Sequence, residues 1–258
     1  MMGKLRRVGS WVSASLPFWF SPFIPILSCL FSPHLVPRSS LSQAIRDRVK
    51  VCWLKQPLPE EDYFRLVAPT TGDTALVVGG GYGYCALYCL KKVGKKGKVI
   101  VVEPSPRCVS FLRRLFAGKR NVVLIQKAIM DRKGEMYFSG GDFLSVFYEG
   151  GRRVKVSIDT LDHICLKLGI KKVDYMVMDV EGAEIEALKG GRKILRRTKK
   201  IAVGAYHLRE GNPTWPWVER YLRRLGFRTK VTEDGVVHAW RSTTREKRVE
   251  SFRKKILL

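Results

Sequence analysis

Carboxylates stand where two buried strands of this sequence are expected to end. Asp179, Glu181 and Glu184 lie at the end of the apolar stretch DYMVMDV or just after it, and Glu103 follows the stretch KVIVV. The carboxyl ends of parallel strands form the edge at which open α/β sheets bind ligands. Carboxylates there can orient a substrate hydroxyl, act as a general base, hold a divalent cation or stabilise the N-terminus of a following helix. We take Asp179 and Glu181 as catalytic candidates and assign no metal ion to them.

A glycine-rich turn comes earlier in the chain. It follows the apolar run of residues 75–78 and leads into an expected helix, an arrangement that lets backbone approach a nucleotide-containing ligand. Tyr84 stands where a dinucleotide-binding turn would have its last glycine, so the spacing is G-x-G-x-G, which matches enzymes that bind S-adenosylmethionine. Glu103 lies twenty residues beyond Gly83, where it can accept hydrogen bonds from both ribose hydroxyls. The expected cofactor-binding residues are Gly79, Gly80, Gly81, Gly83, Glu103 and Asp179.

One histidine is expected at the same edge of the sheet. His207 follows the apolar strand predicted at 201–206, whereas His34 and His163 have no catalytic context and His238 lies inside a predicted strand. An imidazole at the edge could accept a proton from a reacting hydroxyl, or it could serve only in hydrogen bonding. We take His207 as the third catalytic candidate, after the two acids.

The elements that must position these residues alternate between strands and helices. Short apolar runs predict strands, whereas capping residues and apolar periodicity predict helices. The stretch 135–148 is aromatic and contains glycine, and it predicts a loop or hairpin near the ligand. The predicted strands are 75–78, 98–102, 121–125, 152–158, 174–180, 201–206, 227–231 and 236–240, and the predicted helices are 41–54, 60–66, 84–90, 159–168, 183–195 and 215–225.

The chain is strongly basic. It has 258 residues, with 48 Lys and Arg against 23 Asp and Glu, for a formal net charge of +25. This balance favours acidic partners such as nucleic acid, an anionic membrane surface or a phosphorylated substrate. The hydrophobic share of 45% excludes a disordered polycation. The charge is spread along the whole chain and amide side chains are few, a pattern of heat-adapted, thermophile proteins, so we interpret it mainly as a surface property.

The two ends of the chain differ in composition from the middle. Residues 8–37 contain no Lys, Arg, Asp or Glu, but five prolines interrupt this hydrophobic stretch, and each interior proline removes a helix hydrogen bond. We therefore expect a broken segment that lies on a membrane surface or over the domain. The predicted organisation is a hydrophobic segment at 1–40, an α/β domain at 41–240 and a basic tail at 241–258, in a cytoplasmic protein associated with a membrane surface.

The order of these motifs resembles the FkbM family of S-adenosylmethionine-dependent methyltransferases. The resemblance covers residues 71–240, and its most specific pieces are IDTLD at 158–162, DVEGAEIEALKG at 179–190 and GKVIVVEPSP at 97–106. It implies an α/β class I methyltransferase fold, which is a Rossmann-like seven-stranded sheet with a reversed last strand and helices on both faces. It also implies in-line methylation of a hydroxyl on a sugar, a glycolipid or another small-molecule acceptor.

The chain departs from the family pattern at three positions. Val77 stands where the family usually has an acid, Gly81 where it usually has Asn, and Val177 where it often has Lys. The first two changes weaken contacts expected around the methionine part of the cofactor, and the third removes a charge near the reaction centre. Three alternatives stay open: an RNA methyltransferase, suggested by the charge; a catalytically degenerate cofactor-binding protein, suggested by Val77; and a membrane-tethered adaptor.

Overall fold

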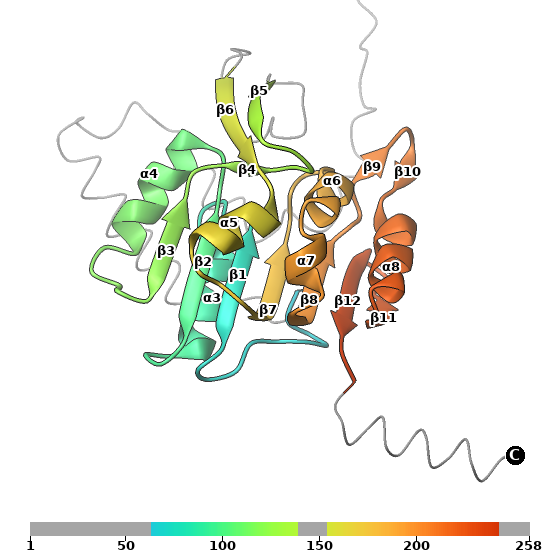
Figure 1. The fold of residues 1–258 in the computed structure, drawn as a ribbon, viewed down its shortest axis with the longest axis horizontal. Coiled ribbons are helices and arrows are strands. Elements are labelled where there is room, and N and C mark those ends of the chain that lie inside the picture. The colour runs from blue at the N-terminus through green and yellow to red at the C-terminus, as the bar shows by residue number, and fades with distance from the viewer. Residues whose placement is uncertain (1–62, 139–153, 243–258) are drawn as a thin grey trace, which may run out of the picture. The chain divides into compact units, whose positions relative to one another are not determined.

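The computed structural model describes residues 63–138 and 154–242 of the chain (Figure 1). The chain divides into two compact units, Met1–Gln56 and Pro57–Leu258, and all of the described residues belong to the second. In these two described ranges, no helix has the length and apolar character that crossing a membrane requires.

Several predicted features lie outside the described residues. They are the hydrophobic N-terminal segment, the helix at 41–54, the basic tail after residue 242 and most of the stretch 135–148. Of the helix predicted at 60–66, only residues 63–66 are described, and they form bends instead of a helix. The division of the chain at residues 40 and 240 therefore stays a prediction.

Seven strands form the main sheet, and one of them is reversed. The strand β12 pairs antiparallel with both of its neighbours, β8 and β11, whereas the other pairings of this sheet are parallel. This arrangement confirms the predicted class I methyltransferase sheet with a reversed last strand. In spatial order the strands are β11 (Arg228–Val231), β12 (Val236–Trp240), β8 (Thr198–Gly204), β7 (Val173–Met178), β1 (Thr74–Val78), β2 (Lys98–Val102) and β3 (Val122–Ile125).

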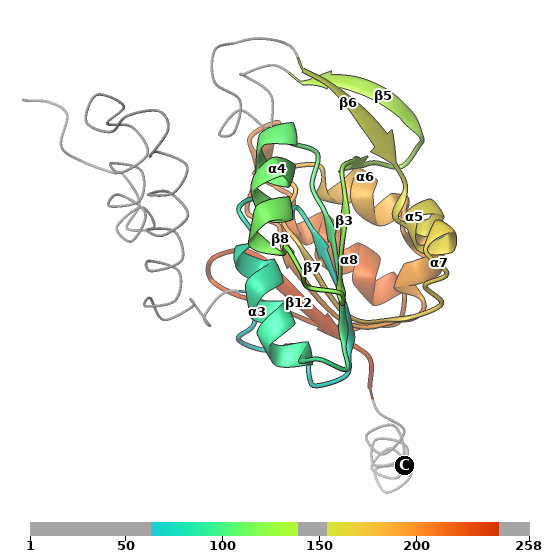
Figure 2. The same ribbon diagram turned by 90° about the vertical axis from the view of Figure 1, so that its left-hand side faces the viewer.

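Helices cover both faces of this sheet, as Figure 2 shows. The central strands β1, β2 and β7 are apolar at almost every position because both of their faces are buried. Each face has its own hydrophobic cluster: α3 and α4 pack on one side, and the remaining helices pack on the other. The helices are α3 (Tyr84–Val93), α4 (Pro106–Leu115), α5 (Leu161–Lys167), α6 (Glu184–Lys189), α7 (Arg192–Leu195) and α8 (Trp215–Arg224).

The order of the strands reverses between β1 and β7. From β1 the chain builds outward through β2 to β3, and it then returns to place β7 and β8 on the other side of β1. A crevice at the carboxyl ends of such a pair is where open α/β sheets bind ligands. Gly79 directly follows β1 and Asp179 directly follows β7, so the fold brings the two main predicted motifs to this point.

Two smaller sheets accompany the main one. A three-stranded sheet contains β4 (Ala128–Ile129), β6 (Val154–Asp159) and β5 (Gly134–Phe138), and β5 pairs antiparallel with β6. The described part of the stretch 135–148 is therefore a strand of this antiparallel pair. The second small sheet pairs β9 (Leu208–Arg209) with β10 (Asn212–Pro213) just after His207.

The structure corrects one predicted helix and adds another. The helix predicted at 183–195 is two helices, because the chain turns at Gly190 and Gly191, where a β-carbon on Gly190 would overlap the Met130 carbonyl oxygen. The second piece, α7, starts afresh because the Asp162 carboxylate accepts hydrogen bonds from two of its backbone N–H groups. The helix α4 was not predicted, although Ser105 accepts a capping hydrogen bond and Pro106 occupies its first turn.

Candidate active site

The glycine turn after β1 is tightly packed at Gly79 and Gly80 and open at Gly81. The N–H groups of Gly79 and Gly80 donate to the Val102 carbonyl oxygen at 2.9 and 3.1 Å, which holds the turn against β2. Gly79 has φ +88°, and a β-carbon there would overlap the Asp179 carbonyl oxygen. Gly81 also has positive φ, yet apart from its chain neighbours no atom of the described residues lies within 4 Å of the place its β-carbon would take. The turn therefore offers open space at Gly81, whereas Gly79, two residues earlier, is in close contact with Asp179 at the end of β7.

Glu103 ties this turn to the end of β2. One carboxylate oxygen, Oε2, accepts a hydrogen bond from the Gly81 N–H at 2.8 Å, and Oε1 accepts one from the Ser105 N–H at 2.8 Å. Burial raises the pKa of Glu103, and these backbone hydrogen bonds oppose part of that rise. Each oxygen keeps a second lone pair. A buried carboxylate beside an open glycine turn fits a ligand that brings ribose hydroxyls, as the sequence predicted.

Asp179 extends from the end of β7 toward two tyrosines. Its Oδ2 accepts hydrogen bonds from the hydroxyls of Tyr63 at 2.8 Å and Tyr206 at 3.3 Å. Its Oδ1 is buried and takes no hydrogen bond from any residue of the described ranges, although the side chain as a whole is 30% exposed. Burial, reinforced by the negative charge of Glu181, raises the pKa of Asp179 to about 6 against the opposing effect of His207.

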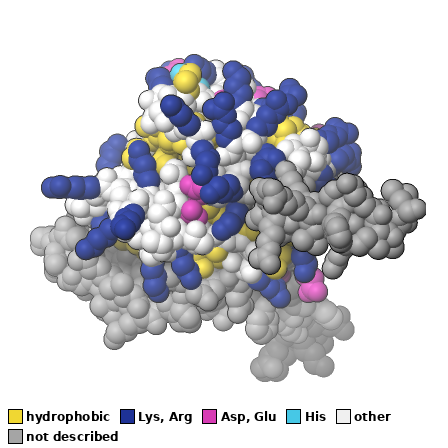
Figure 3. Space-filling view, turned by 60° about the horizontal axis from the view of Figure 1, so that its bottom comes forward, with side chains coloured by type: hydrophobic (Ala, Val, Ile, Leu, Met, Phe, Trp, Pro, Cys, Tyr) yellow, Lys and Arg dark blue, Asp and Glu magenta, His cyan; other side chains and the backbone are white. Residues whose placement is uncertain are grey.

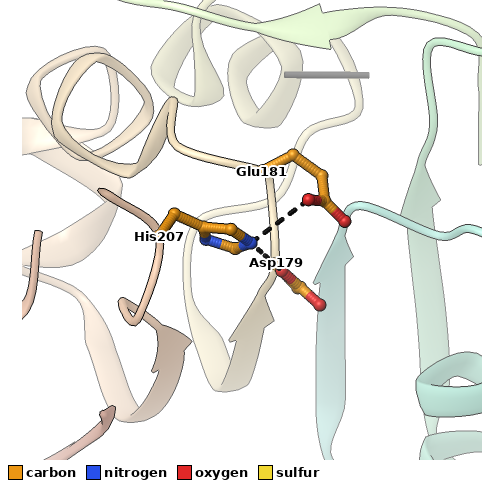
Figure 4. A group of neighbouring side chains, drawn as sticks. All are labelled: Asp179, Glu181 and His207. Atoms are coloured by element: carbon orange, nitrogen blue, oxygen red, sulfur yellow. Dashed lines mark ion pairs between the residues drawn. The ribbon is translucent and has the colours of Figure 1, made fainter. Parts of the chain in front are cut away.

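His207 lies among three carboxylates, two of which, Asp179 and Glu181, are drawn in Figure 4. Its Nε2 is 3.2 Å from Glu181 Oε2 and 3.7 Å from Asp179 Oδ1, and its Nδ1 is 2.9 Å from Glu184 Oε1. Burial alone would lower the pKa of His207, but the hydrogen bonds with Glu181 and Glu184 outweigh it and raise that pKa to about 10. With no other ligand on Nε2, the imidazole is therefore a cation at neutral pH and neutralises part of this acidic cluster.

Glu184 supports the cluster from inside the protein. Its side chain is fully buried and lies 2.9 Å from His207 Nδ1, and it accepts hydrogen bonds from the Gly182 N–H at 2.8 Å and the Thr214 hydroxyl at 3.1 Å. Its neighbour in the turn, Glu181, has φ 52°, a left-handed conformation that is rare for a residue with a side chain. Residues with such strained backbone cluster at active sites and ligand-binding segments.

The structure brings the sequence-predicted site residues together at one edge. The glycine turn and Glu103 form one half, whereas Asp179, Glu181 and His207 form the other, and the contact of Gly79 with Asp179 joins them. Sequence reasoning missed the two tyrosines on Asp179. Tyr206 could have been noticed because it precedes His207 at a strand end, whereas nothing local marks Tyr63, which lies 116 positions from Asp179.

Two of the three departures from the family pattern lie outside the site. Val77 and Val177 are register partners on β1 and β7, and each is only 1% exposed within the cluster that packs under α3. The third departure, Gly81, is in the open part of the turn. The valines therefore belong to the hydrophobic core, and only the glycine faces the space where a ligand would lie.

Comparison with protein families gives one match that covers more than half of the chain. Residues 71–229 match the family described as Methyltransferase FkbM domain. Among curated proteins, the 2-O-methyltransferase NoeI of Sinorhizobium fredii is 27% identical over 127 residues, which are 41% of this chain and 52% of that protein. The chain thus spans about half the length of this curated relative.

Solved structures of low sequence identity are also similar to this chain. A SAM-dependent methyltransferase from Aquifex aeolicus has a TM-score of 0.44 and 18% identity, covering 74% of this chain and 96% of its own. A SAM-dependent O-methyltransferase from Thermotoga maritima has a TM-score of 0.42 and 12% identity, with coverages of 87% and 72%. Fibrillarin from Aeropyrum pernix, solved with S-adenosyl-L-methionine, has a TM-score of 0.43 and 15% identity, with coverages of 69% and 70%.

Proposed function

This chain belongs to the FkbM family of S-adenosylmethionine-dependent methyltransferases, and we propose on that premise that it methylates a hydroxyl of a sugar, glycolipid or other small-molecule acceptor. One observation supports a hydroxyl acceptor above the others. Asp179 Oδ1 is buried beside the open glycine turn and has no hydrogen-bond donor in the described part of the chain. An acceptor hydroxyl would supply the missing donor, and it would place its oxygen where a methyl group arrives.

The cofactor half of the site consists of the glycine turn and Glu103. Glu103 would take the ribose hydroxyls on its free lone pairs, and the backbone from Gly79 to Gly83 would form the floor under the methionine part. When bound there, S-adenosylmethionine supplies a methyl carbon on a positively charged sulfur. The protein's contribution is alignment, since near-attack positioning of two reactants is worth several kcal/mol of the barrier.

The acceptor half is organised around Asp179. We assign it the role of accepting the hydroxyl proton at Oδ1, while Tyr63 and Tyr206 fix the carboxylate through Oδ2. His207 was a candidate base, but a protonated imidazole has no lone pair to accept a proton. We therefore give His207 the role of holding Glu181 in place and of offsetting the negative charge of Asp179.

A sugar is the acceptor class that we favour, and the similarity to a protein described as a 2-O-methyltransferase supports it. RNA is the second candidate, prompted by the charge. The exposed lysines weaken it, because many lie at the sheet edge opposite the site, in the last turn of α3, in the loops that enter β2 and β7, and at the start of β8. Figure 3 shows basic side chains spread over that end of the molecule. These lysines are Lys91, Lys92, Lys95, Lys96, Lys171, Lys172 and Lys199.

The segment at residues 8–37 keeps its proposed role in membrane-surface association, since a glycolipid acceptor would be found there. We further propose that the enzyme works from the cytoplasm. Fractionation of cells that express the full chain, compared with a chain beginning at Leu41, tests the anchoring role. The full chain is expected in the membrane fraction and the shortened chain in the soluble one, and equal distribution of the two would refute the anchoring role.

The proposed function is tested in two steps with the full chain. Calorimetry with S-adenosylmethionine is expected to show saturable binding of one molecule per chain, which Glu103→Gln weakens. Transfer of labelled methyl groups is then measured with free sugars, lipid-linked sugars and RNA as acceptors. Label in a sugar supports the proposal, label in RNA alone would replace it with the second candidate, and cofactor binding without label in any acceptor would favour a degenerate protein.

A further inference from the structure

We propose that Asp179, Glu181 and His207 bind a divalent cation of the Mn²⁺ type at the reaction centre. The sequence analysis assigned no metal, and the family match does not supply one. One donor atom of each residue, Asp179 Oδ1, Glu181 Oε2 and His207 Nε2, lies within 4.8 Å of the other two (Figure 4). The three donors come from the end of β7, the turn that follows it and the end of β8, so the fold itself brings them together.

The spacing of the donors suits a single ion. Two ligand atoms about 2.1 Å from one ion and roughly at right angles lie about 3 Å apart. His207 Nε2 is 3.2 Å from Glu181 Oε2 and 3.7 Å from Asp179 Oδ1. The two printed distances are therefore close to the separation of ligands on one ion, and side-chain rotations would bring the donors to ligand distance.

A buried carboxylate lies beside the imidazole. Glu184 Oε1 lies 2.9 Å from His207 Nδ1, although the pair does not have hydrogen-bond geometry, and the other ring nitrogen, Nε2, faces Asp179 and Glu181. Metal-binding histidines almost always donate their second ring N–H to such a carboxylate, carbonyl or water. Glu184 is itself held by the Gly182 N–H and the Thr214 hydroxyl, so its place beside His207 is fixed by the fold.

One of the three donor atoms, Asp179 Oδ1, lacks a partner in the described ranges, and a cation there would take the place that the proposed function gives to the acceptor hydroxyl. Asp179 Oδ2 is occupied by Tyr63 and Tyr206, but Oδ1, the oxygen that faces His207 Nε2, is buried without any hydrogen bond in the described ranges. A buried carboxylate oxygen left without a partner is costly. A cation between Oδ1 and Nε2 removes that cost and also balances two adjacent negative charges.

The ligand set indicates the class of metal. Two carboxylate oxygens with one imidazole nitrogen are less suited to Mg²⁺ and Ca²⁺, which prefer all-oxygen sites, and less suited to structural Zn²⁺, which takes four protein ligands. Three protein ligands leave positions free on a six-coordinate ion. This part of the inference rests on the proposed function: a free position would take the acceptor's hydroxyl oxygen next to Asp179.

The competing explanation is that protonation of His207 alone balances the charge of the cluster. In that case the imidazolium neutralises the carboxylates and no metal binds.

The purified full chain, stripped with a chelator, is titrated with Mn²⁺, and the free ion is followed by electron paramagnetic resonance without cofactor or acceptor. We expect saturable loss of the signal at one ion per chain. Glu181→Gln and His207→Asn should each weaken binding by roughly tenfold or more.

Glu135→Gln is the matched control, because it removes an exposed carboxylate whose one ion pair within the described residues is with Lys155 on the neighbouring strand. It should bind Mn²⁺ as the unchanged chain does. Absence of Mn²⁺ binding at millimolar concentration, or equal binding by all four proteins, would overturn the proposal in favour of the proton. Circular dichroism shows whether each variant is folded. If one of Glu181→Gln and His207→Asn is misfolded, the other one tests the proposal.

The metal-site proposal and the proposed function can be refuted independently of each other. Methyl transfer by a protein that binds no Mn²⁺ would remove the site and keep the function. Saturable Mn²⁺ binding that depends on Glu181 and His207, in a protein that methylates no acceptor, would keep the site and remove the function.

Discussion

Val77 of β1 and Val177 of β7 lie opposite each other in the parallel ladder, and both are buried in the same hydrophobic cluster. The family pattern usually has an acid at the position of Val77 and often has a lysine at the position of Val177. The two departures therefore occur as neighbours, and together they leave no unpaired charge. Replacing a buried ion pair by an apolar pair is often neutral or stabilising, whereas removing one partner alone is costly. The valines are better explained as a joint change in the core than as decay of the site.

This pairing predicts how charges would behave at the two positions. Val177→Lys alone should lower the free energy of unfolding by about 3–5 kcal/mol, because it buries a charge without a partner. The double variant Val77→Asp/Val177→Lys should be more stable than the sum of the two single effects predicts, by about 1–3 kcal/mol. Urea unfolding of the four proteins in a double-mutant cycle measures the difference. Strictly additive effects would show that the two positions do not interact.

A second prediction concerns the contact between the glycine turn and Asp179. Gly72→Ala and Gly79→Ala both place a side chain at a φ near +88°, but only the second overlaps another group, the Asp179 carbonyl oxygen. Gly72→Ala should therefore cost about 1–2 kcal/mol for its backbone conformation. Gly79→Ala should cost clearly more and should abolish S-adenosylmethionine binding, since the turn must move away from β7. Thermal unfolding and calorimetry provide the comparison, and equal losses in the two variants would contradict the importance of this contact.

A third prediction separates the two halves of the site. Asp179→Asn should lower kcat by about 10²–10⁴, the usual contribution of general acid–base catalysis, and leave the affinity for S-adenosylmethionine nearly unchanged. Glu103→Gln should weaken the affinity for S-adenosylmethionine and leave kcat nearly unchanged, because its carboxylate contacts the glycine turn and lies away from the acceptor. Steady-state kinetics combined with calorimetry can resolve the two effects. Loss of affinity and turnover to the same extent in both variants would refute the division of roles.

A fourth prediction concerns pH and stability. Asp174 Oδ1 forms ion pairs with Lys172 and Lys199 at 2.9 and 2.8 Å, and Oδ2 accepts a hydrogen bond from the Thr74 N–H. Burial alone would raise the pKa of Asp174, but these partners outweigh it and lower that pKa to about 2. Because the folded pKa is below the unfolded one, the stabilisation is complete above pH 4–5, roughly, and is lost as the pH falls toward 2.

The measurement is urea unfolding of Asp174→Asn between pH 7 and pH 2. The variant should be less stable than the unchanged chain by about 1–2 kcal/mol at pH 7, after allowance for solvent screening of the two exposed lysines, and the difference should vanish near pH 2. Asp131→Asn is the control, since in the part of the chain that the structure describes Asp131 pairs with its exposed neighbour Arg132 alone. A difference for Asp174→Asn that persists at pH 2 would mean that its charge is not the cause.

Much of this fold could be predicted because its signals are local. The apolar runs of β1, β2 and β7 identify buried strands, and the glycines and acids directly after them identify the ligand edge. The helix α4 also had a local signal, Ser105 followed by Pro106, which the prediction overlooked. The break between α6 and α7 had one as well, the pair Gly190-Gly191, but the close approach of Gly190 to Met130, sixty positions earlier in the chain, could not be predicted.

The site was predicted in its parts but not in its arrangement. Asp179, Glu181 and His207 were found because each follows a strand of the sheet. Tyr63 was not, because its hydrogen bond to Asp179 depends on how the chain before β1 packs on the sheet. The charge state of His207 could not be predicted either, since it results from three carboxylates that only the folded chain brings around one ring.

The buried carboxylate of Glu184 has a consequence for the order in which the chain becomes active. Its partners are spread from Gly182 through His207 to Thr214, at the start of α8. During synthesis at the ribosome, Glu184 emerges thirty residues before Thr214 and must wait for it. The reaction centre is therefore completed only when the last third of the domain has been made and has docked. A nascent chain that has already formed the cofactor half would still be without an organised acceptor half.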